Sequence, residues 1–329
     1  MLPSESPNTM SIQAPVLCLT MNPAVDLSTD TERVVPTHKL RCGTALHDAG
    51  GGGVNVARVL TRLGGTAHAL CPAGGPSGEW LKSRIADEGL AAHFVAIAQE
   101  TRVSLTVHEL SSGEEFRFVM PGPGLSEPEW RACLQAVLDR QPAPVWVVAS
   151  GSLPPGVPVD FYAQLARLCR ERGAKLVLDA AGPALAAALA EGVYLVKPNL
   201  RELSELLGEP LESPAAWRAA AKGLVDRGVA EVVALTLGHL GAMLVTREGI
   251  WCAEPLAVPV VSAVGAGDSF VGGMVWALHD GQPILDAFAW GVAAGSATLL
   301  TAGTALCCAE DVQRLRADVV VTSPPTLPS

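Results

Sequence analysis

Residues 262–273, SAVGAGDSFVGG, place three small residues and a carboxylate where a helix is expected to begin. The first turn of a helix exposes backbone N–H groups, and its macrodipole adds partial positive charge there. Because Gly265, Ala266 and Gly267 carry little side chain, an anion can approach these amides closely. Asp268, at the edge of this anion hole, could act as a base on a hydroxyl that attacks the anion, or could merely cap the helix.

The glycine cluster in DAGGGGVNVAR, residues 48–58, is a second candidate site. Four glycines before a helical pattern are compatible with a tight turn or with a dinucleotide-binding fingerprint. That fingerprint needs a strand directly before the glycines and an acidic residue about 20 positions later, and neither is found. A backbone site for a polyhydroxylated ligand, with Asn55 adding its amide, fits the cluster better.

Polar residues also follow other apolar runs of the chain. In VKPNLRELSELLG, Asn199 and Glu202 have the spacing of a capping box, but at the carboxyl end of a strand their oxygens would also suit hydrated Mg²⁺. Asp26, in NPAVD, could accept hydrogen bonds from sugar hydroxyls or lie in a solvated turn. In TLGHLGAML, two glycines could lie near a nucleotide base. The sequence contains no P-loop and no protein-kinase motif.

Apolar runs of strand length alternate with helical patterns along the chain. The strands are expected at residues 16–20, 66–71, 145–150, 175–180, 193–197 and 231–237. The helices are expected at residues 55–64, 78–89, 127–140, 160–173, 212–228 and 269–278. Near-continuous apolar strands separated by helices predict an α/β fold, in which helices cover both faces of a mostly parallel sheet.

Two segments, 27–46 and 101–120, break this rhythm with the period-2 pattern of exposed strands. In the second, Val103, Leu105 and Val107 face Phe116 and Phe118 across the turn SSGEE, which predicts a hairpin. We expect both segments to form a small β-sheet that projects from the main body, either as a lid or as a dimer surface.

The bulk composition excludes several classes of function. The chain has 329 residues, 49% of them apolar, and its net charge is 23 − 33 = −10 without a basic run, which argues against binding to nucleic acid or an anionic membrane. The weakly hydrophobic span 290–309 predicts a packed core helix and a loop, not a membrane span. The eight cysteines lack C-x-x-C spacing, which indicates reduced thiols in a cytoplasmic protein. Residues 1–13 and 319–329 are expected to be disordered tails around one domain, 14–318.

Four motifs, and the order in which they occur, resemble the PfkB/ribokinase family of sugar kinases. They are GGGGVNVARVLTRLGG, SGSLPPGV, KPNLREL and SAVGAGDSFVGG. The resemblance runs from about residue 14 to 316, and MNPAVD, HKLRC and FRFVMPGPGLSE are most similar to its 6-phosphofructokinase isozyme 2 branch. It implies a three-layer α/β/α ribokinase-like fold with a β lid, ATP and Mg²⁺ as cofactors, and a homodimer paired through the lids. The implied reaction converts fructose 6-phosphate and ATP to fructose 1,6-bisphosphate and ADP. A 1-phosphofructokinase, a tagatose-6-phosphate kinase and, more distantly, a non-catalytic sugar-phosphate sensor stay open as alternatives.

The resemblance also implies roles for individual residues. Asp268 would be the general base, and the amides of Gly265, Ala266 and Gly267 would form the anion hole for the γ-phosphoryl group. The residues implied to bind the sugar phosphate are Asp26, Lys39, Arg41, Gly51, Gly52, Asn55, Arg102 and Ser152. Those implied to bind the nucleotide are Lys197, Asn199, Glu202, Thr236, Gly238, Gly241, Ser262 and Val264, with Asn199 and Glu202 reaching Mg²⁺ through water.

The chain departs from the family pattern near the nucleotide. Ala263 stands where this branch commonly has threonine, so one hydroxyl is lost. Many family members hold a monovalent cation, K⁺, on carbonyls around this loop and residues 301–306. Thr301 and Ala305 replace more polar residues there, which argues against a dependence on potassium.

Overall fold

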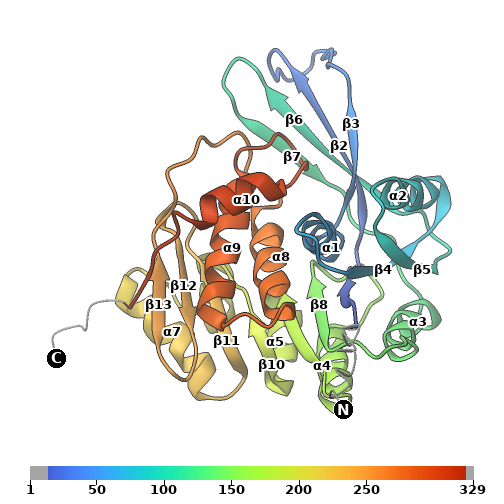
Figure 1. Ribbon diagram of the computed structural model, residues 1–329. Helices are drawn as coiled ribbons and strands as arrows, with labels where there is room; N and C mark the ends of the chain where they lie inside the picture. The colour runs from blue at the N-terminus through green and yellow to red at the C-terminus, as the bar shows by residue number, and fades with distance from the viewer. Residues whose placement is uncertain (1–13, 324–329) are drawn as a thin grey trace, which may run out of the picture.

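The computed structural model describes residues 14–323 (Figure 1). Its main sheet has ten strands in the order β14-β13-β12-β11-β10-β9-β8-β1-β4-β5. The strands from β11 to β5 run parallel, and β12, β13 and β14 add an antiparallel edge. The strands are β1 (Val16–Leu19), β4 (Ala67–Ala73), β5 (Ala91–Ala96), β8 (Trp146–Ser150), β9 (Lys175–Asp179), β10 (Val193–Val196), β11 (Ala230–Thr236), β12 (Ala242–Val245), β13 (Ile250–Ala253) and β14 (Val321–Thr322).

Helices cover both faces of this sheet, as the alternation of apolar runs predicts. One face carries α1 (Gly52–Arg62), α2 (Gly75–Asp87), α8 (Ala266–His279), α9 (Ile284–Thr298) and α10 (Ala309–Arg316). The other carries α3 (Glu127–Leu138), α4 (Phe161–Glu171), α5 (Gly182–Glu191), α6 (Leu200–Leu207) and α7 (Pro214–Asp226). Along β1, Val16 and Cys18 join the first core while Leu17 and Leu19 join the second, because successive side chains of a strand point to opposite faces.

The segment 290–309 forms most of α9 and a loop, and α9 packs against α8 (Figure 1). Glycines allow this close approach: a Cβ on Gly273 would lie 2.6 Å from the carbonyl oxygen of Trp290, and one on Gly291 would lie 2.5 Å from Cγ of Met274. Phe270 and Phe288 also meet edge-on across the interface. Among the described residues, no helix has the length and apolar character needed to cross a membrane.

A second sheet, ordered β3-β2-β6-β7, rises from the main body at the top of Figure 1. It consists of β2 (Ala24–Thr31), β3 (Leu46–Gly50), β6 (Arg102–Glu109) and β7 (Glu115–Val119). We call these four strands the lid. The predicted hairpin is confirmed, since Leu105 pairs with Phe118 and Val107 with Phe116.

Two expectations need correction. The segment 27–46 is not strand throughout: residues 32–45 between β2 and β3 form turns and coil, and the strands extend beyond both ends of the predicted segment. This stretch contains Pro36, which cannot donate to a strand ladder, and Thr37, whose φ is 65°. The expected C-terminal tail, 319–329, contains β14, whose Thr322 and Val321 pair with Cys252 and Ala253. Residues 324–329 and the expected N-terminal tail, 1–13, lie outside the described residues.

Candidate active site

The first turn of α8 contains the glycines that the sequence predicts for an anion hole. Gly265 precedes the helix in the left-handed region, with φ of 77°, and a Cβ there would lie 2.4 Å from Cδ2 of Leu306. A side chain at this position would be both strained and obstructed. Glycine therefore suits the residue that precedes this helix, next to Asp268.

Asp268 is held by side chains from two other elements. The amide Nδ2 of Asn55, on α1, donates to Oδ2 of Asp268 at 2.9 Å. The hydroxyl of Ser150, at the end of β8, donates to Oδ1 at 3.3 Å. Burial raises the pKa of Asp268 to about 7 and the charge of Asp179 adds to this, while Asn55, Lys197 and Ser150 oppose it. A carboxyl group with a pKa near neutrality is suited to exchange a proton with a bound hydroxyl.

Two cavities meet at this carboxylate. A smaller cavity of about 180 Å³ lies beneath the lid, and a larger one of about 720 Å³ extends along the carboxyl ends of β8 and β9. Gly52 and Asp268 line both. A Cβ on Gly52 would lie 2.1 Å from Oγ of Ser150 and 3.0 Å from Oδ1 of Asp268, so a side chain there would fill the junction. The site can thus bring two ligands together at one carboxylate.

The smaller cavity combines the carboxylates of Asp26 and Asp268 with two arginines from the lid. It is lined by Asp26, Gly51, Gly52, Asn55, Arg102, Ser104, Leu105, Thr106, Arg117, Val119, Val264, Gly265, Asp268 and Thr304. Arg102 donates to the carbonyl oxygens of Asn22 at 3.1 Å and Met120 at 3.2 Å, while its buried Nε has no hydrogen-bond partner. Burial raises the pKa of Asp26 to about 6, although Arg102 and Arg117 oppose this. The two guanidinium groups suit an anionic ligand, and Asp26 suits its hydroxyls.

Charged groups also border the larger cavity, where Asp179, Glu202 and Asp268 are lining residues. Lys197 is buried, and its Nζ lies 3.2 Å from Oδ1 of Asp179. Burial works to lower the pKa of Lys197, but the charges of Asp179, Glu202 and Asp268 outweigh it and hold that pKa above its usual value. The lysine therefore stays cationic behind the anion hole, where a Cβ on Gly267 would lie 3.5 Å from its Nζ.

The capping box that the sequence suggests at the start of α6 is present. Oδ1 of Asn199 accepts from the backbone N–H of Glu202 at 2.9 Å, and Oε2 of Glu202 accepts from the N–H of Asn199 at 2.9 Å. Ser152 lines the larger cavity, and its hydroxyl accepts from Nδ2 of Asn22 at 3.0 Å.

Several residues implied by the resemblance lie away from both cavities. Lys39 and Arg41 are exposed in the coil between β2 and β3, and neither lines a cavity. Thr236 ends β11, Gly238 begins the short helix Gly238–Leu240, Gly241 follows that helix, and the Ser262 hydroxyl accepts from the N–H of Val264 at 3.2 Å. The other predicted site residues that line neither cavity are Lys197, Asn199, Ala266 and Gly267.

Ser150, Asp179 and Arg117 are among the lining residues that sequence reasoning missed. Ser150 ends β8 and Asp179 ends β9, and both strands were predicted, so the rule that ligands bind at the carboxyl ends of parallel strands could have found them. Arg117 lies between Phe116 and Phe118 in the predicted hairpin, and the period of two places it on the opposite face of the lid.

The sequence model of the pfkB family of carbohydrate kinases matches residues 13–311 of this chain. The chain belongs to the pfkB family. Among members of the family, it is 43% identical over 299 residues to the ATP-dependent 6-phosphofructokinase isozyme 2 of Mycobacterium tuberculosis, a match that covers 91% of this chain and 88% of that one. The Escherichia coli protein of the same name is 43% identical over 303 residues, covering 92% and 98%.

Solved structures of pfkB family members agree with this relationship. The crystal structure of phosphofructokinase-2 from Escherichia coli in complex with fructose-6-phosphate superposes with a TM-score of 0.87 at 41% identity, covering 92% of this chain and 98% of that one. A tetrameric inhibited form of the same enzyme gives a TM-score of 0.87 at 42% identity, with the same coverage. The family fold is thus confirmed as ribokinase-like, with a mostly parallel sheet and a small second sheet.

Proposed function

We propose that this chain is an ATP-dependent 6-phosphofructokinase, which converts fructose 6-phosphate and ATP to fructose 1,6-bisphosphate and ADP. One observation carries the proposal: Asp268 lines both cavities at the amino-terminal end of α8. A base located there can accept the proton of the sugar's 1-hydroxyl while that oxygen attacks the γ-phosphorus of ATP. The bond from the γ-phosphorus to the bridging oxygen breaks, and ADP leaves.

The residues of the smaller cavity are assigned to the sugar phosphate. Arg102 and Arg117 bind its 6-phosphate, because planar guanidinium groups form paired hydrogen bonds with phosphate oxygens. Asp26 and Asn55 hold sugar hydroxyls, and the backbone of Gly51 and Gly52 borders the ring. The amides of Gly265, Ala266 and Gly267 stabilise the charge on the transferred group.

The residues around the larger cavity are assigned to the phosphates of ATP and to Mg²⁺. The oxygens of Asp179 and Glu202 fit a hydrated Mg²⁺, which is commonly held by one or two carboxylates, waters and the phosphates of the substrate. Such an ion would neutralise charge on the phosphates of ATP. Lys197 adds a fixed positive charge, and Asn199 orients Glu202 through the capping box. Thr236, Gly238, Gly241 and Ser262 are assigned to the rest of the nucleotide, whereas Val264, implied by the resemblance for the nucleotide, lines the smaller cavity.

Potassium fits the loop around residues 301–306 less well. The carbonyl oxygens of Ala305 and Cys307 accept hydrogen bonds from the guanidinium of Arg62. A cation there would meet an existing positive charge, so we assign no role to K⁺.

A lid-mediated homodimer is part of the proposal. Phe118 and Leu46 of the lid are 49% and 62% exposed. A second lid could cover them. The net charge, the metabolic class of the relatives and the free cysteines support a cytoplasmic location without nucleic-acid or membrane partners.

Substrate assays test this function. Release of ADP is measured with fructose 6-phosphate, fructose 1-phosphate and tagatose 6-phosphate, and we expect the highest kcat/KM with fructose 6-phosphate. A clear preference for either other sugar phosphate would make this a 1-phosphofructokinase or a tagatose-6-phosphate kinase. Binding of sugar phosphate without turnover of any of them would indicate a sensor.

A further inference from the structure

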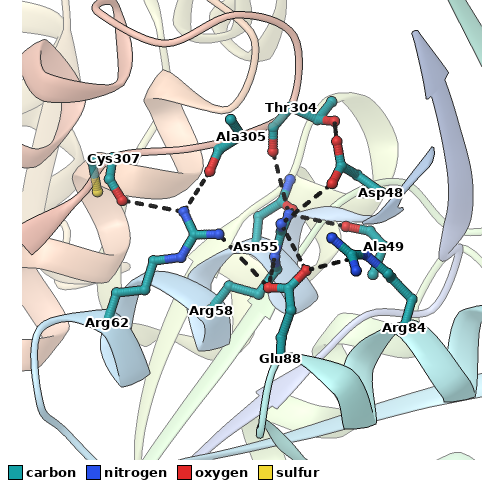
Figure 2. A network of polar contacts seen from close by, with 10 residues as sticks. All are labelled: Asp48, Ala49, Asn55, Arg58, Arg62, Arg84, Glu88, Thr304, Ala305 and Cys307. Carbon is teal, nitrogen blue, oxygen red and sulfur yellow. Dashed lines mark hydrogen bonds and ion pairs between the residues drawn. The ribbon is translucent and has the colours of Figure 1, made fainter. Parts of the chain in front are cut away.

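A buried arginine lies where the lid joins α1 (Figure 2). Arg58 is only 3% exposed, and its guanidinium contacts four different parts of the chain. It donates to Glu88, beyond α2, through Nε at 2.7 Å and NH2 at 3.0 Å. Its NH1 donates to the carbonyl oxygens of Ala49 in β3 at 3.2 Å and Thr304 at 3.3 Å. Because the guanidinium has so many fixed partners, it can adopt only one orientation.

The same nitrogen of Arg58 faces the side-chain amide of Asn55, with NH1 3.4 Å from Oδ1. An arginine has donors and no acceptors, so the atom turned toward it must be the amide oxygen. The distance is long for a hydrogen bond, but a guanidinium in a dry interior still attracts the oxygen and repels the NH₂ group. The NH₂ group of Asn55 is thereby left to face Asp268, at 2.9 Å.

Arg58 also fixes the lower end of the lid. Besides its bond to Ala49, it lies 3.8 Å from the carboxylate of Asp48, which accepts a 2.6 Å hydrogen bond from the Thr304 hydroxyl. Asp48 pairs in register with Asp26, a lining residue of the smaller cavity. Figure 2 shows Arg58 between these lid residues and Asn55.

We propose that Arg58 is a positioning residue, which holds the Asn55 amide with its NH₂ group toward Asp268 and fastens the lower end of the lid to the same helix. The first part rests on the proposed role of Asp268 as base. If the amide turned over, its oxygen would face the Asp268 carboxylate and disfavour the ionised form that accepts the proton. Arg58 touches neither cavity, so its effect reaches the reaction through Asn55 and β3.

The test compares a variant that lacks the Arg58 guanidinium with two variants that keep it and change a neighbouring charge. R58M/E88Q removes the guanidinium together with its main counter-charge, so no buried carboxylate is left without a partner and the net charge is unchanged. E88Q alone keeps the contact with Asn55. R84Q removes another arginine from the same Glu88, at 3.9 Å, without touching Asn55 or the lid.

The first measurement is the pH profile of kcat. The charged groups around Asp268 are Asp179 and Lys197 at the sheet edge and Asp26, Arg102 and Arg117 in the lid, and all variants keep them. We expect the acid limb of R58M/E88Q to move to higher pH by about 0.5 units or more, and that of E88Q and R84Q to move by less than about 0.2 units. An unmoved limb in R58M/E88Q, or an equal shift in E88Q, would overturn the role of Arg58 toward Asn55.

The second measurement is hydrogen exchange of β3 in the ligand-free protein, which needs no catalytic activity. We expect exchange of residues 46–50 to accelerate about tenfold in R58M/E88Q and to stay at the parental rate in R84Q. Equal exchange in all variants would overturn the fastening of the lid. If the parent enzyme turned over no sugar phosphate, the proposed function would fail, but hydrogen exchange would still test whether Arg58 fastens the lid. If R58M/E88Q does not fold, both measurements are made on R58K, because one ammonium group cannot replace the four directed contacts of the guanidinium.

Discussion

Asn55 and Asp268 are 213 positions apart in the chain and are joined by a 2.9 Å hydrogen bond. Asn55 lies in the first turns of α1 and Asp268 in the first turn of α8, and these helices pack side by side. Their close approach depends on Gly272, where a Cβ would lie 2.6 Å from Cγ1 of Val59. The proposed catalytic group is therefore held by the packing of two helices from opposite ends of the chain.

Replacing the base should stabilise the fold while it abolishes turnover. The pKa of Asp268 near 7 lies above that of an exposed aspartate, so the unfolded chain loses this proton at lower pH than the folded one. The free energy of unfolding therefore falls as pH rises from about 4 to 7, and this group lowers it no further above pH 7. D268N should raise the free energy of unfolding at pH 8 by about 2 kcal/mol, and by less at pH 5.

Urea denaturation at the two pH values measures this difference, and single-turnover assays measure the rate. We expect D268N to lose about three or more orders of magnitude in kcat while it still binds fructose 6-phosphate. A variant that was less stable than the parent at pH 8 would contradict the raised pKa of this buried carboxyl group. Parental turnover would remove Asp268 from the mechanism.

Neutralising either lid arginine should selectively weaken the binding of the sugar phosphate. R102Q and R117Q should each raise KM for fructose 6-phosphate about 30- to 100-fold, which corresponds to about 2–3 kcal/mol of lost charged hydrogen bonds. KM for ATP should change less than about threefold, because neither arginine lines the larger cavity. Steady-state kinetics with each substrate varied in turn decides this. Equal losses for both substrates would place the sugar phosphate elsewhere.

A single methyl group at the junction of the cavities should block the reaction. In G52A, the new Cβ would meet Oγ of Ser150 and Oδ1 of Asp268, so the two ligands could not approach. We expect kcat to fall at least about 100-fold, as it does when reacting groups are displaced by about 1 Å. G223A is the matched control, because Gly223 lies in α7, where a Cβ would meet only the flexible end of Arg227 at 3.2 Å. Similar activities of the two variants would show that the cavities do not meet at Gly52.

The proposed dimer can be separated from the catalytic site. Phe118 is half exposed on β7, so F118E would place a charge within a lid-to-lid interface. Light scattering should show the parent as a dimer and F118E as a monomer at the same concentration. L240E, at another exposed leucine that lies outside the lid, should leave the dimer intact. A monomeric parent, or an F118E variant that remained dimeric, would exclude the lid as the interface.

The sequence predicts the central part of this fold well because buried parallel strands have an unmistakable apolar pattern. All six predicted strands are present, and the helix predicted at 269–278 lies within α8. It predicts the sheet edges poorly. β5 has only one buried residue, Val95, and β14 has two residues in all, so neither differs clearly from a loop in composition.

The candidate site divides in the same way. Gly265, Asp268 and Asn55 could be selected from local motifs, because each motif begins a helix. The pairing of Asn55 with Asp268 and of Arg58 with Glu88 joins distant segments, which no local pattern reports. Lys39 and Arg41 were implied by resemblance, yet the chain around them is coil and places their side chains in solvent.

The lid is built from two separate stretches of chain, since β2 of the first hairpin runs parallel to β6 of the second over eight paired residues. Removing either hairpin would leave the other with an unprotected edge of unpaired N–H and C=O groups. Ancestral or shortened versions of this protein should therefore carry both stretches or neither, and a loop graft that transfers one hairpin alone should yield an aggregating product.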